Sequence, residues 1–193
     1  AAVIFDMDGL MLDSERAILE SLRAAALDQR ADIDPGWWLC LIGHTDAVCR
    51  ARLGAEIGDV AADVLLADGH ARYVAVAERG VPHRPGIVAL LDLLVAHDMP
   101  RAVATSTRSP LAQRKLEAAG LLGYFDVVCT SSDVAQPKPA PDVYLLAAER
   151  LGVAPAQCLV LEDSPTGVRA ALAAGMTAVQ VPYLLAPDDA VRA

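Results

Sequence analysis

The sequence predicts a doubly wound α/β fold, a parallel sheet with helices on both faces, that carries an inserted α-helical cap domain. Five short apolar runs are separated by segments of helical periodicity, at residues 2–5, 101–105, 126–130, 157–161 and 177–181. The runs are continuous and do not alternate with polar residues, which is typical of parallel strands covered on both faces. Strands that alternate with helices in this way indicate a doubly wound sheet.

The helices between these runs have recognisable ends. Apolar residues from Ile87 to Val95 recur at helical spacing. Two further helices are predicted to begin at a serine N-cap followed by proline and to end at a glycine, Ser109-Pro110 to Gly120 and Ser164-Pro165 to Gly175.

One region breaks the alternation of strand and helix. From residue 14 to about residue 80 the pattern is helical and no strand is convincing. We therefore predict an α/β catalytic core made of residues 1–13 and 81–193, with residues 14–80 inserted as a helical cap.

Composition excludes some partners. The chain has 193 residues, 54% of them hydrophobic, and a net charge of −9, which argues against nucleic acid but leaves room for a phosphorylated substrate held by a few local cations. No apolar run is long enough to span a bilayer, so no membrane contact is expected. The four cysteines form no C-x-x-C pair, so we expect reduced thiols and a cytoplasmic location. We also expect a monomer.

Polar side chains follow the predicted strands at the points where ligands bind in such sheets. They are Asp6 and Asp8 after the first strand, Thr105 and Ser106 after the second, Glu162 and Asp163 after the fourth, and Lys138 in the segment before the helix that precedes the fourth. Alone, each has a plain explanation as a turn, a helix cap or a solvated loop residue. Their joint placement at one sheet edge indicates a site.

The charges in this set suit phosphate chemistry. Carboxylates of Asp6, Asp8 and Asp163 are oxygen ligands for a hard cation such as Mg²⁺. Thr105 and nearby backbone N–H groups can bind phosphate oxygens. Lys138, one of only two lysines in the chain, can hold a carboxylate and a phosphate together.

The two acids of the first segment can divide the chemistry between them. Asp6 emerges directly from its strand and is the better-fixed nucleophile for an aspartyl-phosphate. Asp8 can protonate the leaving alcohol and later deprotonate the attacking water. Positive charge from the metal and from Lys138 would stabilise the phosphoryl group in transfer.

The phrases DMDGLMLDSE, ATSTRS, KPAPDVY and LEDSPTGVRAALAAGM resemble the haloacid dehalogenase superfamily, in its phosphatase and phosphomutase branch with a helical cap. The resemblance covers essentially the whole chain. It implies that Asp6 is the nucleophile and Asp8 the acid/base, whose backbone carbonyl also binds Mg²⁺. It further implies that Thr105, with Ser106 beside it, binds phosphate, that Lys138 steadies the phosphoryl group, and that Asp163 with Glu162 completes the metal site. A glycine-started cap loop faces the active site in similar proteins, which makes His44 and Thr45 the candidates for substrate contact.

Three departures narrow the choice within that superfamily. Its dehalogenases lack the second aspartate, present here as Asp8, and its phosphonoacetaldehyde hydrolases use a cap lysine, which residues 14–80 do not contain. Its β-phosphoglucomutases have a histidine where this chain has Ile18. We therefore expect a Mg²⁺-dependent phosphatase acting on a small, sugar phosphate-like metabolite. A β-phosphoglucomutase-like sugar phosphomutase is the alternative, and a signalling receiver is a third, non-enzymatic reading.

Overall fold

The structure is a computed structural model that describes residues 1–42 and 46–183, and the chain divides into two compact units. One consists of Ala1–Asp13 and Gly80–Ala193 and is called the α/β unit here; the other, Ser14–Arg79, is called the helical unit. The functional division into a catalytic core of residues 1–13 and 81–193 and a cap of residues 14–80 stays a prediction.

A five-stranded parallel sheet forms the centre of the α/β unit, in the order β3-β2-β1-β4-β5. The strands are β1 (Ala2–Phe5), β2 (Arg101–Ala104), β3 (Val127–Cys129), β4 (Cys158–Glu162) and β5 (Thr177–Gln180). All five predicted strands and the predicted fold class are confirmed. The chain runs outward from β1 in one direction and then crosses to its other side, so the strand order reverses between β1 and β4. Ligands bind beside such a reversal, at the carboxyl ends of the strands.

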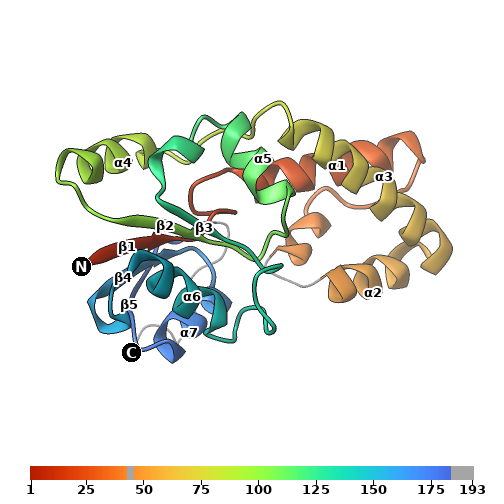
Figure 1. Cartoon of the computed structure of the whole chain (residues 1–193). Coiled ribbons are helices and arrows are strands. Elements are labelled where there is room, and N and C mark those ends of the chain that lie inside the picture. The colour runs from red at the N-terminus through yellow and green to blue at the C-terminus, as the bar shows by residue number, and fades with distance from the viewer. Residues whose placement is uncertain (43–45, 184–193) are drawn as a thin grey trace. The chain divides into compact units, whose positions relative to one another are not determined.

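Helices cover both faces of this sheet, with α6 and α7 on one face and α4 and α5 on the other (Figure 1). Their bounds are α4 (Ile87–Ala96), α5 (Leu111–Ala118), α6 (Asp142–Leu151) and α7 (Pro165–Ala173), with short 3₁₀ turns η2 (Leu122–Tyr124) and η3 (Pro155–Gln157). No helix among the residues that the structure describes is both long and apolar enough to cross a bilayer.

The two predicted Ser-Pro helix starts have different outcomes. Ser164 is the N-cap of α7, and its hydroxyl accepts from the Gly167 amide at 3.0 Å, as predicted. The prediction for Ser109 is wrong by one residue. Pro110 is the N-cap of α5, which begins at Leu111.

Small aliphatic side chains fill the core, as the low aromatic content of 4% requires. Between the sheet and helices α6 and α7 the buried cluster is rich in alanine, with Ile4, Val160 and Tyr144 among its larger members. Every residue of β1 is buried. This burial on both faces explains why the strands read as continuous apolar runs.

The helical unit contains α1 (Ser14–Asp28), the 3₁₀ turn η1 (Trp37–Leu41), α2 (Asp46–Ile57) and α3 (Asp59–Ala77), and its described residues form no strand. Helix α3 packs on α1 and α2. Gly69 allows α3 to approach α1 closely, since a Cβ at this position would lie 2.5 Å from Leu22 Cδ2.

The segments by which the chain leaves and re-enters the α/β unit are hydrogen-bonded to each other. The amide of Asp13 donates to the carbonyl of Pro82 at 2.9 Å, and the amide of Arg84 donates to that of Met11 at 2.8 Å. An isolated antiparallel bridge joins Leu12 and His83 between them.

Candidate active site

The carboxyl ends of β1, β2 and β4 lie next to one another because β1 pairs with both of the other strands. Asp6 directly follows β1, and its amide still donates to the carbonyl of Leu161 in β4, at 3.0 Å. Thr105 directly follows β2, and its amide donates to Cys129 in β3 at the same distance. These backbone hydrogen bonds fix both residues at the carboxyl ends of the strands.

Lys138 connects three of these strand ends from the segment that precedes α6. Its Nζ donates to Asp6 Oδ1 at 2.6 Å, to Glu162 Oε1 at 2.7 Å and to the carbonyl of Ala104 at 2.9 Å. The ammonium also lies 4.7 Å from the centre of the Tyr144 ring. With its side chain only 4% exposed, Lys138 is a buried cation that holds two carboxylates at fixed positions.

Burial and charge together set the protonation of this cluster. Burial raises the pKa of Asp6 to about 7, although the contact with Lys138 acts to lower it. Burial alone would lower the pKa of Lys138, but its acidic neighbours, Asp6 above all, raise that pKa well above its usual value. Lys138 therefore stays protonated. A further positive charge nearby would stabilise the ionised form of Asp6.

Three acidic side chains come close enough here to share one metal ion. Single carboxylate oxygens of Asp6, Glu162 and Asp163 all lie within 4.8 Å of one another. With Lys138 as the counter-ion, three carboxylates leave an excess of negative charge, which fits a hard divalent cation. Gly9 permits this approach, because its φ is +84° and a Cβ there would lie 2.0 Å from Asp163 Oδ2.

Glu162 differs from the other two acids because both of its oxygens are already used. Oε1 accepts from Lys138 and, at 2.8 Å, from the Tyr144 hydroxyl, while Oε2 accepts from the amide and the hydroxyl of Ser164, each at 3.0 Å. Burial acts to raise the pKa of Glu162, but Lys138 and these hydrogen bonds lower it. Glu162 thus holds Lys138 in place as an ionised carboxylate.

Gly167 makes room for that carboxylate. A Cβ on Gly167 would lie 1.6 Å from Glu162 Oε1, so Gly167→Ala forces the buried acid to move. We expect the free energy of unfolding to fall by about 1–3 kcal/mol, despite alanine's better helix propensity, and activity to fall with it. Urea unfolding measures this effect. Gly123→Ala is the matched control, because nothing lies within 4 Å of a Cβ there. Equal stability of the two variants would contradict the packing described.

Asp8 has partners that the sequence analysis did not identify. Thr107 Oγ1 donates to Asp8 Oδ2 at 2.6 Å, and Nζ of Lys115 donates to Asp8 Oδ1. Thr107 is itself oriented by Thr105, whose Oγ1 accepts from the Thr107 amide at 3.0 Å. The sequence signal for Lys115 is its rarity, since it is one of only two lysines in the chain.

The other predicted residues have mixed outcomes. Thr105 and Asp163 are both buried at the carboxyl ends of their strands, whereas Ser106 is exposed. His44 and Thr45 lie outside the described residues, so their role as substrate contacts stays a prediction.

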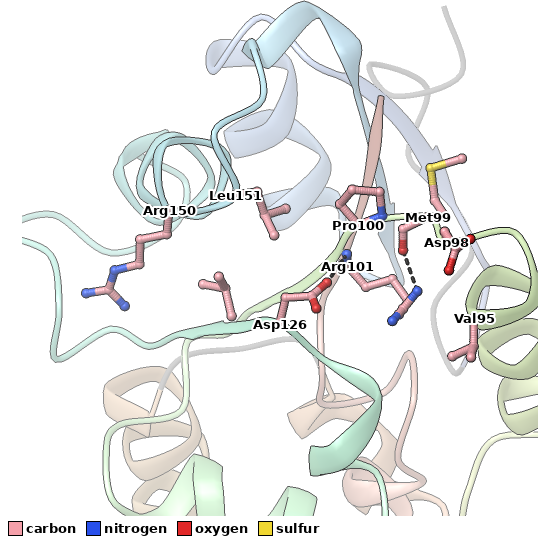
Figure 2. A pocket seen from close by; sticks show the side chains of 9 residues that line it. Val95, Asp98, Met99, Pro100, Arg101, Asp126, Arg150 and Leu151 are labelled. Atoms are coloured by element: carbon pink, nitrogen blue, oxygen red, sulfur yellow. Dashed lines mark hydrogen bonds between the residues drawn. The ribbon is translucent and has the colours of Figure 1, made fainter.

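A separate cavity of about 440 Å³ lies at the amino ends of β2 and β3, away from the carboxyl ends described above (Figure 2). Its lining includes Pro100 and Arg101 at the amino end of β2 and Asp126 just before β3. Arg101 is tied to the walls, because its amide donates to Asp126 and its Nε to the carbonyl of Tyr124, at 3.0 and 2.7 Å. This cavity contains none of the predicted site residues.

Comparison with known proteins adds a family to this geometry. The family model described as haloacid dehalogenase-like hydrolase matches residues 1–175. The chain is 34% identical to hexitol phosphatase A of Escherichia coli, over 98% of this chain and 85% of that protein. It is also 34% identical to fructose-1-phosphate phosphatase YqaB of the same organism, over 95% of this chain and 97% of that protein.

A solved structure has the same fold over nearly the whole chain. The crystal structure of a proposed beta-phosphoglucomutase from Thermotoga maritima superimposes with a TM-score of 0.85 at 30% identity, covering 99% of this chain and 89% of that one.

Proposed function

Because this chain belongs to the haloacid dehalogenase-like hydrolases, we propose that it is a Mg²⁺-dependent phosphatase that hydrolyses a small sugar phosphate through an aspartyl-phosphate on Asp6. The observation that supports this most is the juxtaposition of Asp6 with Asp163 and Lys138. Single carboxylate oxygens of Asp6 and Asp163 lie within 4.8 Å of each other, and Lys138 Nζ lies 2.6 Å from Asp6 Oδ1. Nucleophile, metal ligand and cation thus occupy one small region of the sheet edge.

The metal would be held by Asp6, Asp163 and the backbone carbonyl of Asp8, while Glu162 holds Lys138. The ion supplies positive charge that offsets the charge of the transferring phosphoryl group. Lys138 supplies a second positive charge from the protein itself and orients Asp6 through Oδ1. Thr105 and Ser106 contribute donors for the phosphate oxygens.

Two displacements at phosphorus complete the reaction. In the first, an oxygen of Asp6 bonds to phosphorus as the bond to the alcohol oxygen breaks, and Asp8 gives that oxygen a proton. In the second, Asp8 takes a proton from water as the water oxygen bonds to phosphorus. The bond to Asp6 then breaks and inorganic phosphate leaves, with Asp6 again a carboxylate and Asp8 again carrying a proton.

The substrate class is inferred from the relatives. Hexitol phosphatase A and fructose-1-phosphate phosphatase both act on phosphorylated small carbohydrates, and each aligns over nearly the whole of this chain. We infer that this chain acts on a phosphomonoester of similar size. Its cap, residues 14–79, would select among them, with His44 and Thr45 as candidate contacts.

A panel of hexitol, hexose and ketose phosphates tests this proposal. Phosphate release is expected from at least one member in the presence of Mg²⁺, and a chelator should abolish it because the excess negative charge of the site then repels the substrate. Added Mg²⁺ should restore the activity. Asp163→Asn should raise the Mg²⁺ concentration required. Absence of phosphate release across the panel, with the protein folded, would contradict the proposal.

A sugar phosphomutase is the second candidate, favoured by the structural similarity to the proposed beta-phosphoglucomutase. It is opposed by Ile18, which stands where β-phosphoglucomutases have a histidine. Phosphorus NMR separates the two. A mutase would convert one sugar phosphate isomer into another with little free phosphate, and would depend on a bisphosphate activator.

A further inference from the structure

Lys115 is a buried lysine to which the reaction described above assigns no part. It lies in α5 and its side chain is 2% exposed, although lysine is almost never fully buried unless it is paired. Both lysines of the chain are buried in this way, and each donates to a carboxylate of the first segment: Lys138 to Asp6 and Lys115 to Asp8.

Asp8 needs such a partner because it lies beyond the end of its strand. The backbone of Asp6 is held by β4, but Asp8 lies in the turn after β1, beside Gly9 with its φ of +84°, and its side chain is 29% exposed. A short side chain in such a turn has rotameric freedom. Lys115 and Thr107 remove it by each binding a different oxygen of the carboxylate.

The two donors are themselves fixed. The ammonium of Lys115 projects from a regular helix. Thr107 is held by the hydrogen bond that its amide donates to Thr105 Oγ1 at 3.0 Å. The orientation of the Asp8 carboxylate is therefore fixed by one residue of a helix and one residue of the segment that follows β2. Proton transfer in catalysis requires the acid within about 3 Å of the atom that it protonates, so this orientation matters for rate.

We propose that Lys115, together with Thr107, is a positioning residue that orients the carboxyl group of Asp8, which carries a proton when it acts as the acid, for proton transfer to the leaving group. The inference rests on the proposed function for its catalytic part, while the hold on Asp8 is a property of the structure alone. Lys115 touches neither substrate nor phosphorus in this role. It acts only through the orientation of Asp8.

Leaving-group dependence provides the kinetic test. Release of a sugar alcohol needs a proton from Asp8, whereas p-nitrophenolate leaves without one. In Lys115→Met, kcat/KM for the sugar phosphate is expected to fall about 10- to 100-fold, and for p-nitrophenyl phosphate by less than about threefold. Asp8→Asn should give the same pattern with a larger loss.

Matched variants separate positioning from packing. Arg114→Met removes a cation from an exposed position of the same helix and should change both kcat/KM values by less than about twofold. Thr107→Val removes the second donor at nearly constant shape and should reproduce the selective loss. Thr107→Ser keeps the hydroxyl donor and should keep kcat/KM for the sugar phosphate near the wild-type value. The Thr107 pair also serves if Lys115→Met does not fold. Equal losses on both substrates would overturn the inference.

A crystal structure of Lys115→Met tests the hold on Asp8 without any assay. The Asp8 carboxylate is expected to turn away from its present position or to occupy more than one rotamer. An unchanged, single Asp8 conformer would overturn the inference even if the protein proves to be a phosphatase. If instead Asp8 moves but the wild type releases no phosphate from any ester, the proposed function fails, and with it the catalytic part of this inference.

Discussion

Replacement of Asp6 by asparagine is expected to abolish turnover, with kcat falling by at least about 10⁴-fold. The amide cannot form the acyl phosphate on which both displacements depend. Folding should survive, because Lys138 keeps its contacts with Glu162 and with the carbonyl of Ala104. Phosphate release measured over hours, beside a thermal melt of the same sample, gives both quantities.

A matched control for this change is Asp32→Asn, the same chemical substitution at an exposed position of the helical unit. Its activity should equal that of the wild type. If Asp6→Asn kept more than about a hundredth of the wild-type rate, the aspartyl-phosphate mechanism would be refuted, since neighbouring groups alone do not supply so much of an enzymatic rate.

Replacement of Lys138 by methionine is expected to be the most destabilising change at this site. It leaves Asp6 and Glu162 buried without their shared cation, and breaking such a buried contact costs about 3–5 kcal/mol of unfolding free energy. Activity should also fall by orders of magnitude, because a positive charge beside the phosphoryl group is lost. Chemical denaturation and phosphate release measure the two effects separately.

The double variant Lys138→Met, Glu162→Gln distinguishes stability from catalysis. Neutralising Glu162 removes one of the two uncompensated charges, so stability should recover in part while activity stays low. Recovery of activity to the wild-type level would show that Lys138 serves packing alone. The same stability in the single and double variants would contradict the contact between Lys138 and Glu162.

The stability deficit of Lys138→Met should also grow with pH. In the wild type the pKa of Glu162 is lowered, so the stability from this group is present above its usual pKa and is lost as the pH falls. In the variant, burial without the cation raises that pKa, so stability is lost as the pH rises. The difference between the two proteins should therefore be larger near pH 8 than near about pH 5.

Sequence patterns predicted the strands and the strand-end residues well, for a physical reason. Parallel strands covered on both faces must be apolar throughout, and the first polar residue after each one marks the edge where ligands bind. Asp6 and Thr105 follow directly from that rule, and Glu162 is the last residue of β4 itself. The helical character of residues 14–80 was equally visible, because helical periodicity there runs on without a strand.

Other features depend on contacts that no local pattern records. The pairing of Lys115 with Asp8 joins residues 107 positions apart, and only the placement of α5 over the sheet brings them together. Glu162 looks like a metal ligand from its place beside Asp163, yet hydrogen bonds to Tyr144 and Ser164 use its oxygens. Ser109 fails as an N-cap because α5 begins one residue later than predicted, at Leu111.

The hydrogen bonds between the segments around Met11 and Arg84 have a consequence for how this protein can vary. They hold the exit and the return of the chain side by side at the border of the α/β unit. Closing a loop between points that are already neighbours costs little more entropy when the loop becomes longer. The length of an insertion at this border can therefore change over evolution, and the substrate preference of the protein with it. The sheet that carries Asp6 and Asp163 stays the same.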